Sequence, residues 1–282
     1  MPDGTWEELI RKWANDIGLP LAQIRAAADR VQEQLVFGCA EYMMKDCRNR
    51  QKSMLSVRKV KLRGFRKRNT ETWGVPFDTF DALIVGSTEI GAEINGKIRG
   101  SGQTKDVAKA EAITRLHARA NQIANEILWL CRGGFADGAM ARWRSLHEVA
   151  VVSVFIADHE EDLAKIYLDF EAIETKRAAD QYEEYCDQLE FDHLGEAAVE
   201  VIRKASEELA GKHDVSMRGN YGWASGVLSK NNPHFFDIEM ACKLTFVRPF
   251  YKYASCNIHA NPKGIFHKLG LALTQEDILL AG

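Results

Sequence analysis

The sequence predicts an all-α protein, a multi-helix bundle that follows an N-terminal helical hairpin and a basic arm. From about residue 78 onward, apolar residues recur every three or four positions, which is the spacing of one buried helix face. Hydrophobic residues make up 46% of the 282 positions, so the chain can bury a substantial core. The β-branched run at 149–157 could form a strand, but no turn signal separates it from the polar residues before it. We therefore predict that this run is helical as well.

Two helices are expected at the N-terminus, over residues 1–48. One apolar stripe spans residues 6–17, and a Gly-x-Pro turn follows it. In the next helix Leu21, Ala28 and Leu35, with apolar residues between them, alternate spacings of three and four, a seam that suits a partner helix. That partner is either the first helix or a second subunit. We expect this segment to serve oligomerisation, which gives a homo-oligomer, or to dock a partner protein.

A basic linker arm is expected over residues 49–76. Residues 45–68 contain 11 basic side chains and one acid, which leaves 26 basic and 39 acidic residues in the other 258. Such an arm can follow a phosphate backbone, dock on the acidic surface of a neighbouring copy, or be a solvated linker. A turn at Trp73–Pro76 is expected to end it, so that the bundle domain spans 77–282. The residues expected to bind nucleic acid are Arg58, Lys59, Lys61, Arg63, Arg66, Lys67 and Arg68.

The bundle is expected to contain antiparallel helices joined by short breaks. Two consecutive glycines at 133–134 predict a left-handed helix exit and a tight reversal into the next helix. That next helix becomes apolar on every side in its second half, so it should run through the middle of the bundle. The helices expected from apolar spacing are 78–94, 107–130, 136–158, 163–189, 197–209, 236–244 and 248–259, with an aromatic and glycine-rich loop at 213–229.

Several classes of protein are disfavoured by what the sequence lacks. It has no signal-peptide pattern and no apolar window of about 18 to 20 residues, so we expect a cytoplasmic chain that does not enter a membrane. Six cysteines occur without a Cys-x-x-Cys pair, so neither disulfides nor a zinc site is expected. We also find no acidic cluster with metal-ligand spacing, no Walker-type glycine loop and no Gly-x-Ser-x-Gly elbow. No metal and no cofactor is therefore expected.

The polar start of the central helix carries the first candidate site, which consists of Arg142, Arg144, His147 and Glu148. Arg144 and Glu148 are four residues apart and share a helix face. Charges at the start of a buried helix need polar partners, because an unpaired buried charge is costly. The partner could be a phosphate, a second ionisable residue or water. An ordinary intrahelical pair of Arg144 with Glu148 explains the same pattern.

Two further segments could contribute to a site. Near the C-terminus Lys252, Ser255 and His259 share one helix face, although a histidine at a helix end is more often a cap on the last carbonyls. In the aromatic loop Tyr221 and Trp223 could stack on a base or pack as a lid on the bundle, and packing is the commoner use. We expect these residues to line the site.

These segments together resemble a bacterial family catalogued as domain of unknown function 5677. The resemblance rests on 132–139, on the Arg-Trp-Arg-Ser-Leu-His-Glu run at 142–148, on Tyr-Gly-Trp-Ala at 221–224 and on 255–259, and covers about 77–270. The family's helical architecture and its contexts of phage defence and abortive infection make it similar to the HEPN ribonucleases.

HEPN enzymes pair across a dimer and carry an Arg, four to six residues, and then a His. Arg142 and His147 meet that spacing, but Trp143 stands where a polar residue usually follows the Arg. The family motif also usually lies on a late helix, which here offers His259 preceded by Lys252. Either the site is composite, from Arg142, Arg144, Glu148 and His259, or the resemblance is architectural only.

The function expected from these residues is a metal-independent endoribonuclease that acts as an effector in antiphage defence. Arg142 or Arg144 would stabilise the pentacoordinate phosphate, and His147 or His259 would serve as general acid or base. Glu148 would orient a histidine or hold an arginine. The alternative is a non-catalytic helical module that binds nucleic acid or a partner protein of a defence system.

Overall fold

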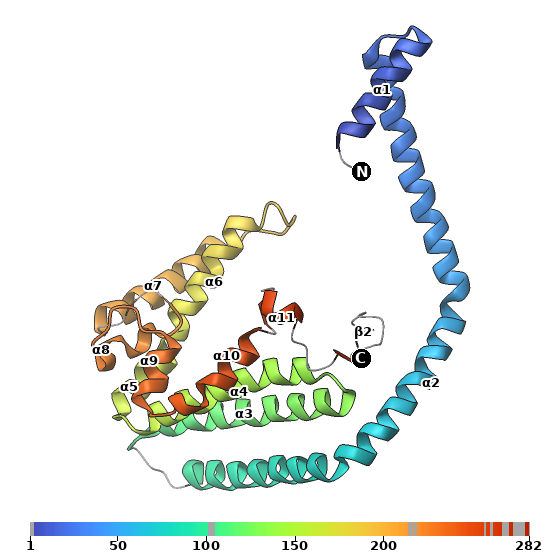
Figure 1. Ribbon diagram of the computed structural model, residues 1–282. Coiled ribbons are helices and arrows are strands. Elements are labelled where there is room, and N and C mark those ends of the chain that lie inside the picture. Colours follow the sequence, from blue (N-terminus) through green and yellow to red (C-terminus); the bar gives the residue numbers. More distant parts are fainter. Residues whose placement is uncertain are drawn as a thin grey trace. The chain divides into compact units, whose positions relative to one another are not determined.

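The computed structural model describes residues 3–100, 105–213, 216, 219–256, 258–259, 262–266, 271–272 and 280–281 (Figure 1). It divides into two compact units, Met1–Arg68 and Asn69–Gly282. The elements are α1 (Asp3–Ile17), α2 (Leu21–Gly100), α3 (Val107–Gly133), α4 (Ala136–Ala157), α5 (Glu161–Asp169), α6 (Glu171–Tyr185), α7 (Glu196–Lys212), η1 (Gly222–Ala224), α8 (Ser225–Leu228), α9 (Phe235–Ala241), η2 (Thr245–Val247), α10 (Arg248–Cys256), α11 (Pro262–Phe266), β1 (Leu271–Ala272) and β2 (Leu280–Ala281).

The all-α prediction is confirmed, because helices make up almost all of the described chain. Within the described residues, β-structure is limited to the two-residue strands β1 and β2, which pair antiparallel. None of the described helices is both long enough and apolar enough to cross a membrane.

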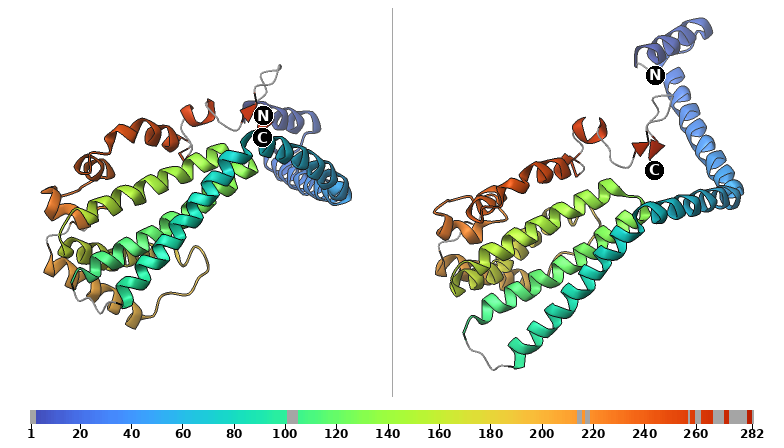
Figure 2. Two further views of the ribbon diagram at one scale, coloured as in Figure 1. Left: turned by 90° about the horizontal axis from the view of Figure 1, so that it is seen from below. Right: turned by 60° about the horizontal axis from the view of Figure 1, so that its bottom comes forward.

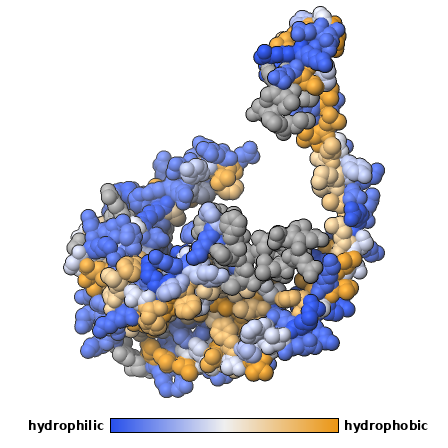
Figure 3. Space-filling model, viewed as in Figure 1, coloured by the Kyte–Doolittle hydropathy of each residue, from blue (hydrophilic) through white to orange (hydrophobic). Residues whose placement is uncertain are grey.

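The first unit consists of α1 and the first part of α2. Ile10 and Ala14 of α1 and Ala28 of α2 are its buried apolar residues. Further along α2, residues 31–44 leave many large apolar side chains exposed, and Figure 3 shows hydrophobic atoms along this stretch. The seam predicted from Leu21 to Leu35 is therefore largely open to solvent, since Val31 and Leu35 are both exposed.

The turn predicted at Trp73–Pro76 is wrong. Helix α2 continues through this whole segment, with Pro76 inside it. Proline fixes φ near the helical value and removes one backbone hydrogen bond, so a long helix can pass through it at a local cost. The proline therefore predicts a helix end at a position that lies inside a helix.

In the second unit, the last part of α2 packs along α3, and α3 packs along α4 (Figure 2). Asn69 donates hydrogen bonds to the carbonyls of Cys131 and Arg132, at 3.1 and 3.2 Å, and Arg132 pairs with Asp81 at 2.9 Å. Gly134, with φ of 82°, ends α3 in the left-handed conformation, as the paired glycines predict. The antiparallel hairpin of α3 and α4 is thus confirmed.

The main core lies between α3, α4, α5 and the segments that follow them. Its centre holds Val151, Phe155 and Ile156 of α4, with Trp223 and Ile238 from later in the chain. The second half of α4 buries one face, with Val151, Val152, Phe155 and Ile156, whereas Ala150, Val154 and Ala157 are exposed, so the helix is not covered on every side.

The first turn of α3 receives its cap from another helix. Glu161 of α5 accepts hydrogen bonds from the backbone N–H groups of Ala108 and Lys109, at 2.7 and 3.0 Å. These N–H groups have no partner within their own helix, and a carboxylate suits the positive end of the helix dipole. This one side chain therefore fastens α5 to the start of α3.

Other element boundaries differ from the predictions. The helix predicted over 163–189 is two helices, α5 and α6, that meet at Phe170, whose buried ring is part of the main core. The helix predicted to reach residue 259 ends at Cys256, and Asn257 is outside the described residues. The loop predicted over 213–229 contains η1 and α8.

Candidate functional site

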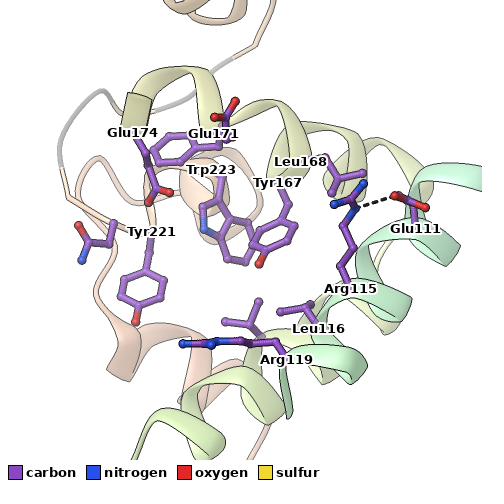
Figure 4. Close-up of a pocket in the computed structure, with 13 residues that line it drawn as sticks. Glu111, Arg115, Leu116, Arg119, Tyr167, Leu168, Glu171, Glu174, Tyr221 and Trp223 are labelled. Carbon is purple, nitrogen blue, oxygen red and sulfur yellow. Dashed lines mark hydrogen bonds and ion pairs between the residues drawn. The ribbon is translucent and has the colours of Figure 1, made fainter. Parts of the chain in front are cut away.

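A cavity with a volume of about 720 Å³ lies between α3, α5, α6 and the loop that carries η1 (Figure 4). Its floor is apolar and aromatic, with Leu116, Val152, Tyr167 and Trp223. The ring of Tyr167 meets that of Trp223 edge-on, with centroids 5.0 Å apart. We call this cavity the α3–α6 cleft.

The ionisable residues of the α3–α6 cleft are separated by charge. Arg115 and Arg119, one turn apart on α3, form one wall, and Glu171 and Glu174 of α6 lie across the aromatic floor (Figure 4). Arg115 pairs with Glu111 at 2.6 Å, but that pair is exposed and therefore weak. The cleft thus offers a cationic wall and an anionic wall to whatever enters it.

The predicted lining residues Tyr221 and Trp223 both contact this cleft. Burial raises the pKa of the Tyr221 hydroxyl, and the charges of Glu148 and Tyr251 raise it further. Tyr221 is therefore a neutral hydrogen-bonding group at neutral pH. Of α4, Val152 lines the cleft, and Glu148 lies one helical turn before it.

Arg144, Glu148 and Tyr251 form a hydrogen-bonded group at the polar start of α4. Arg144 Nε donates to Glu148 Oε1 at 3.0 Å, and the Tyr251 hydroxyl donates to the same oxygen at 2.6 Å. The Arg144 guanidinium also lies over the Tyr251 ring, 4.7 Å from its centroid. Partial burial opposes the arginine charge, yet Tyr251 and Glu148 outweigh it and raise the pKa of Arg144. The intrahelical pair considered from sequence is therefore present, with Tyr251 as a third member.

Burial, together with the Glu148 carboxylate, raises the pKa of Tyr251 to about 12. The hydroxyl is therefore a donor to Glu148 throughout the physiological range. It holds the carboxylate in place and is not available as a base.

His147 points into the protein, where its ring lies beside that of Tyr251, with centroids 5.9 Å apart. Its Nε2 lies 3.0 Å from Glu239 Oε1, and Arg248 NH1 lies 2.5 Å from Glu239 Oε2. Glu239 is fully buried, and only 9% of His147 is exposed. The Trp143 ring stacks on the imidazole at 5.6 Å. A solvent-borne phosphate therefore has no open approach to His147, which the sequence had suggested as a general acid or base.

Arg142 is held on a different side of α4. It forms an ion pair with Glu126 of α3, and its NH1 lies 3.4 Å from the Ser145 hydroxyl. Its Nε atom is buried without a hydrogen-bond partner. Arg142, Arg144 and His147 therefore pair with three different carboxylates, those of Glu126, Glu148 and Glu239.

The predicted C-terminal residues do not join Arg144. Ser255 donates its hydroxyl to the Tyr251 carbonyl at 2.8 Å, which keeps it on its own helix. Lys252 and His259 are exposed. Within the described part of the chain, no hydrogen bond, ion pair or ring contact links His259 to Arg142, Arg144 or Glu148.

The basic residues predicted to bind nucleic acid all lie in the first unit, on α2, and all seven are exposed: Arg58, Lys59, Lys61, Arg63, Arg66, Lys67 and Arg68. Their side chains are therefore accessible to a ligand along the helix.

One group among the described residues has donor atoms suited to a metal ion. Glu183, Cys186 and His193 place one ligand atom each within 4.8 Å of one another. They come from the end of α6 and the segment that leads to α7. The sequence contains no zinc pattern of paired cysteines. The spacing that could have indicated this group is a glutamate three residues before Cys186 and a histidine seven residues after it.

Sequence reasoning also missed Arg115, Arg119, Glu171 and Glu174. Each lies on the polar face of an amphipathic helix, where charged residues are expected whether or not they bind a ligand. Only the packing of α3 against α5 and the η1 loop brings them around one cleft.

The family comparison agrees with part of the resemblance noted from sequence. The model for a family of unknown function (DUF5677) matches residues 110–277, a range that includes the α3–α6 cleft, α4 and α10. The match begins later than the residue 77 expected from sequence, so the last part of α2 lies outside it. Comparisons with curated proteins and with solved structures return no match. Since the matched range is more than half of the chain, the protein belongs to the family of unknown function DUF5677.

Proposed function

We propose that the chain is a helical RNA-binding module that holds a nucleotide of a single strand in the α3–α6 cleft. The observation that carries the proposal is the separation of charge across an aromatic floor, with Arg115 and Arg119 on one side and Glu171 and Glu174 on the other. A nucleotide has the matching polarity, because its phosphate is anionic and its base edges carry hydrogen-bond donors.

The chemistry of each wall fits one part of a nucleotide. A guanidinium binds phosphate with two charge-assisted hydrogen bonds, and Arg115 can exchange its exposed partner Glu111 for a phosphate at little cost. Carboxylates accept hydrogen bonds from amino groups of bases, which suits Glu171 and Glu174. Tyr221, half-buried at the edge of the cleft, offers a ring for base stacking. The three acidic residues of the cleft favour one inserted nucleotide over a backbone that runs along its length.

The basic arm on α2 would supply the sequence-independent part of RNA affinity. Replacing Arg66, Lys67 and Arg68 by glutamine should make the negative slope of log K against log salt shallower by about 2, since each phosphate contact on a single strand contributes about −0.7. Fluorescence anisotropy of a labelled single-stranded RNA at several salt concentrations measures that slope. An unchanged slope would assign the arm to protein contacts.

The cleft is tested with the double variant Arg115→Ala/Arg119→Ala. Loss of two charge-assisted phosphate contacts should weaken RNA binding at least about tenfold at fixed salt. Both side chains are exposed, so the variant should keep the wild-type melting temperature. The matched control is Arg203→Ala on α7, an exposed arginine held by Glu200 and Glu207, which should bind RNA as wild type does. Equal affinities of the double variant and the control would show that RNA does not use this cleft.

A metal-independent endoribonuclease of an antiphage defence system, as the HEPN resemblance implies, is the second candidate. It is favoured by Arg144 and Glu148, which lie on the same helix as Val152 of the cleft floor and offer a guanidinium that could stabilise a phosphate. The general acid or base would then be the exposed His259, because His147 is buried against Glu239.

Incubation of the purified protein with total RNA and a chelator tests this candidate. Cleavage that is lost in His259→Ala, with the melting temperature and RNA affinity kept, would support it. Absence of cleavage in the wild-type protein, or cleavage equal in His259→Ala, would exclude His259 catalysis and leave the binding module.

A further inference from the structure

We propose that Glu183, Cys186 and His193 form a zinc site that fixes the connection between α6 and α7. The site shares no residue with the α3–α6 cleft, so it stands apart from the proposed RNA binding. One thiol, one imidazole and one carboxylate together are a donor set that zinc accepts, and a fourth position stays open to water.

The three donor atoms already lie close to one another. Cys186 Sγ is 3.1 Å from His193 Nδ1, and the same nitrogen is 2.7 Å from Glu183 Oε2. Bond lengths of about 2.3 Å to sulfur and about 2.0 to 2.2 Å to nitrogen and oxygen place donors of one zinc ion roughly 3.2 to 3.7 Å apart. Movements of less than about 1 Å therefore make room for the ion.

The surrounding contacts orient two of the three donors. His193 Nε2, which is 3.7 Å from the thiol and so farther from it than Nδ1, lies 3.1 Å from Asp187 Oδ1. Zinc-binding histidines usually donate their second N–H to a carboxylate in this way. Glu183 Oε1 accepts the backbone N–H of Leu194 at 2.6 Å, which leaves Oε2 directed toward Nδ1.

Burial distinguishes this cysteine from the exposed ones. Cys186 is fully buried, whereas Cys39 and Cys47 are exposed on α2. Its backbone carbonyl also accepts the N–H of Phe191 at 2.9 Å, so the loop folds back over the sulfur. The histidine that completes the group is exposed, which gives an ion a path from solvent.

The binding step is a simple exchange of protons for metal. The thiol proton leaves Cys186 Sγ and the ring proton leaves His193 Nδ1, and both pass to solvent. The thiolate, the neutral imidazole and the carboxylate then each donate an electron pair to zinc. The remaining ring proton stays on Nε2 toward Asp187, and no group is oxidised or reduced.

Cobalt(II) titration of the full-length, metal-stripped protein tests the site. We expect a sulfur-to-cobalt charge-transfer band together with the visible bands of tetrahedral cobalt, and loss of both when zinc is added. The double variant Cys39→Ser/Cys47→Ser, which removes the exposed thiols, should keep the spectrum unchanged. Asp187→Asn should keep the spectrum and weaken cobalt binding about 10- to 100-fold.

Variants of the ligands decide the outcome. Cys186→Ser should abolish the charge-transfer band, and because this cysteine is buried, His193→Ala provides a second test at an exposed position. His193→Ala should lose the tetrahedral spectrum, while in chelator and alkaline solution, where the pair with Glu183 no longer contributes, its melting temperature equals that of the wild type. A wild-type protein without a charge-transfer band, or one whose spectrum survives in His193→Ala, overturns the proposal.

Discussion

Two histidine–glutamate pairs occur in this protein with nearly the same separation but in opposite surroundings. His147 and Glu239 are 3.0 Å apart, and their side chains are 8% and 0% exposed. His193 and Glu183 are 2.7 Å apart, and their side chains are 58% and 32% exposed. The first pair joins α4 to α9, and the second joins α6 to the loop that follows it.

The two pairs differ in burial far more than in the distance between the partners. Glu239 is fully buried, so His147 and Arg248 are its partners in place of water. Glu183 and His193 remain open to solvent, where water can replace either partner and a cation can enter. A histidine next to charged residues in the sequence is thus a poor guide to which kind of pair it makes.

The largest effect is expected from Glu239→Ala. Removing the carboxylate leaves His147 and Arg248 without their buried partner, which should lower the free energy of unfolding by about 3 to 5 kcal/mol. Urea denaturation followed by circular dichroism measures the change. The matched control is Glu200→Ala, an exposed partner of Arg203 on α7, which should cost less than about 1 kcal/mol. Equal losses in the two variants would remove the distinction between buried and open pairs.

An intermediate effect is expected for Arg144 and Glu148, whose side chains are 22% and 29% exposed. A double-mutant cycle with alanine at both positions should give a coupling energy of about 1 kcal/mol, because the ion pair is only partly shielded from water. The exposed pair of Lys176 and Asp180, also four residues apart, should give about 0.3 to 0.5 kcal/mol in the same cycle. A coupling of Arg144 with Glu148 below that of the control would place this group with the surface pairs.

The smallest effect is a pH dependence of the exposed pair in metal-free protein. Hydrogen bonds to Glu183 and then Asp187 raise the pKa of His193, and the hydrogen bond from His193, followed by the Leu194 N–H, lowers the pKa of Glu183. Stabilisation by the histidine is complete below its unfolded pKa of 6.5 and is lost as pH rises through the raised value. Stabilisation by the glutamate is complete above 4.5 and is lost as pH falls through the lowered value.

Comparing Glu183→Gln with wild type tests this window. The difference in melting temperature should be largest between about pH 4.5 and 6.5 and should vanish in alkaline solution. It should also stay well below the effect of Glu239→Ala. A difference that grows toward alkaline pH contradicts the assignment of the shift to this pair.

The helical class and the α3–α4 hairpin could be predicted because both depend on local signals. Apolar spacing marks the buried face of a helix, and the paired glycines permit the left-handed exit seen at Gly134. The error at Pro76 has a local cause too, since a proline fits helical φ while it removes one hydrogen bond.

The site could be predicted only in part, because its contacts are long-range. The partners of His147 and Glu148 are Glu239 and Tyr251, which are 92 and 103 residues away. No spacing rule within α4 could reveal that these two residues are its hydrogen-bond partners, or that Glu239 is fully buried. Tyr221 and Trp223 were found because aromatic residues in a glycine-rich loop are conspicuous, whereas Arg115 resembles any surface arginine.

The cap that Glu161 gives to α3 has a consequence for synthesis of the chain. The amide groups of Ala108 and Lys109 leave the ribosome 53 and 52 residues before the carboxylate that they bind. At typical elongation rates that delay is about 3 to 10 s. Throughout this interval Glu161 cannot cap α3, so we expect the first turn of that helix to fray until α5 has emerged.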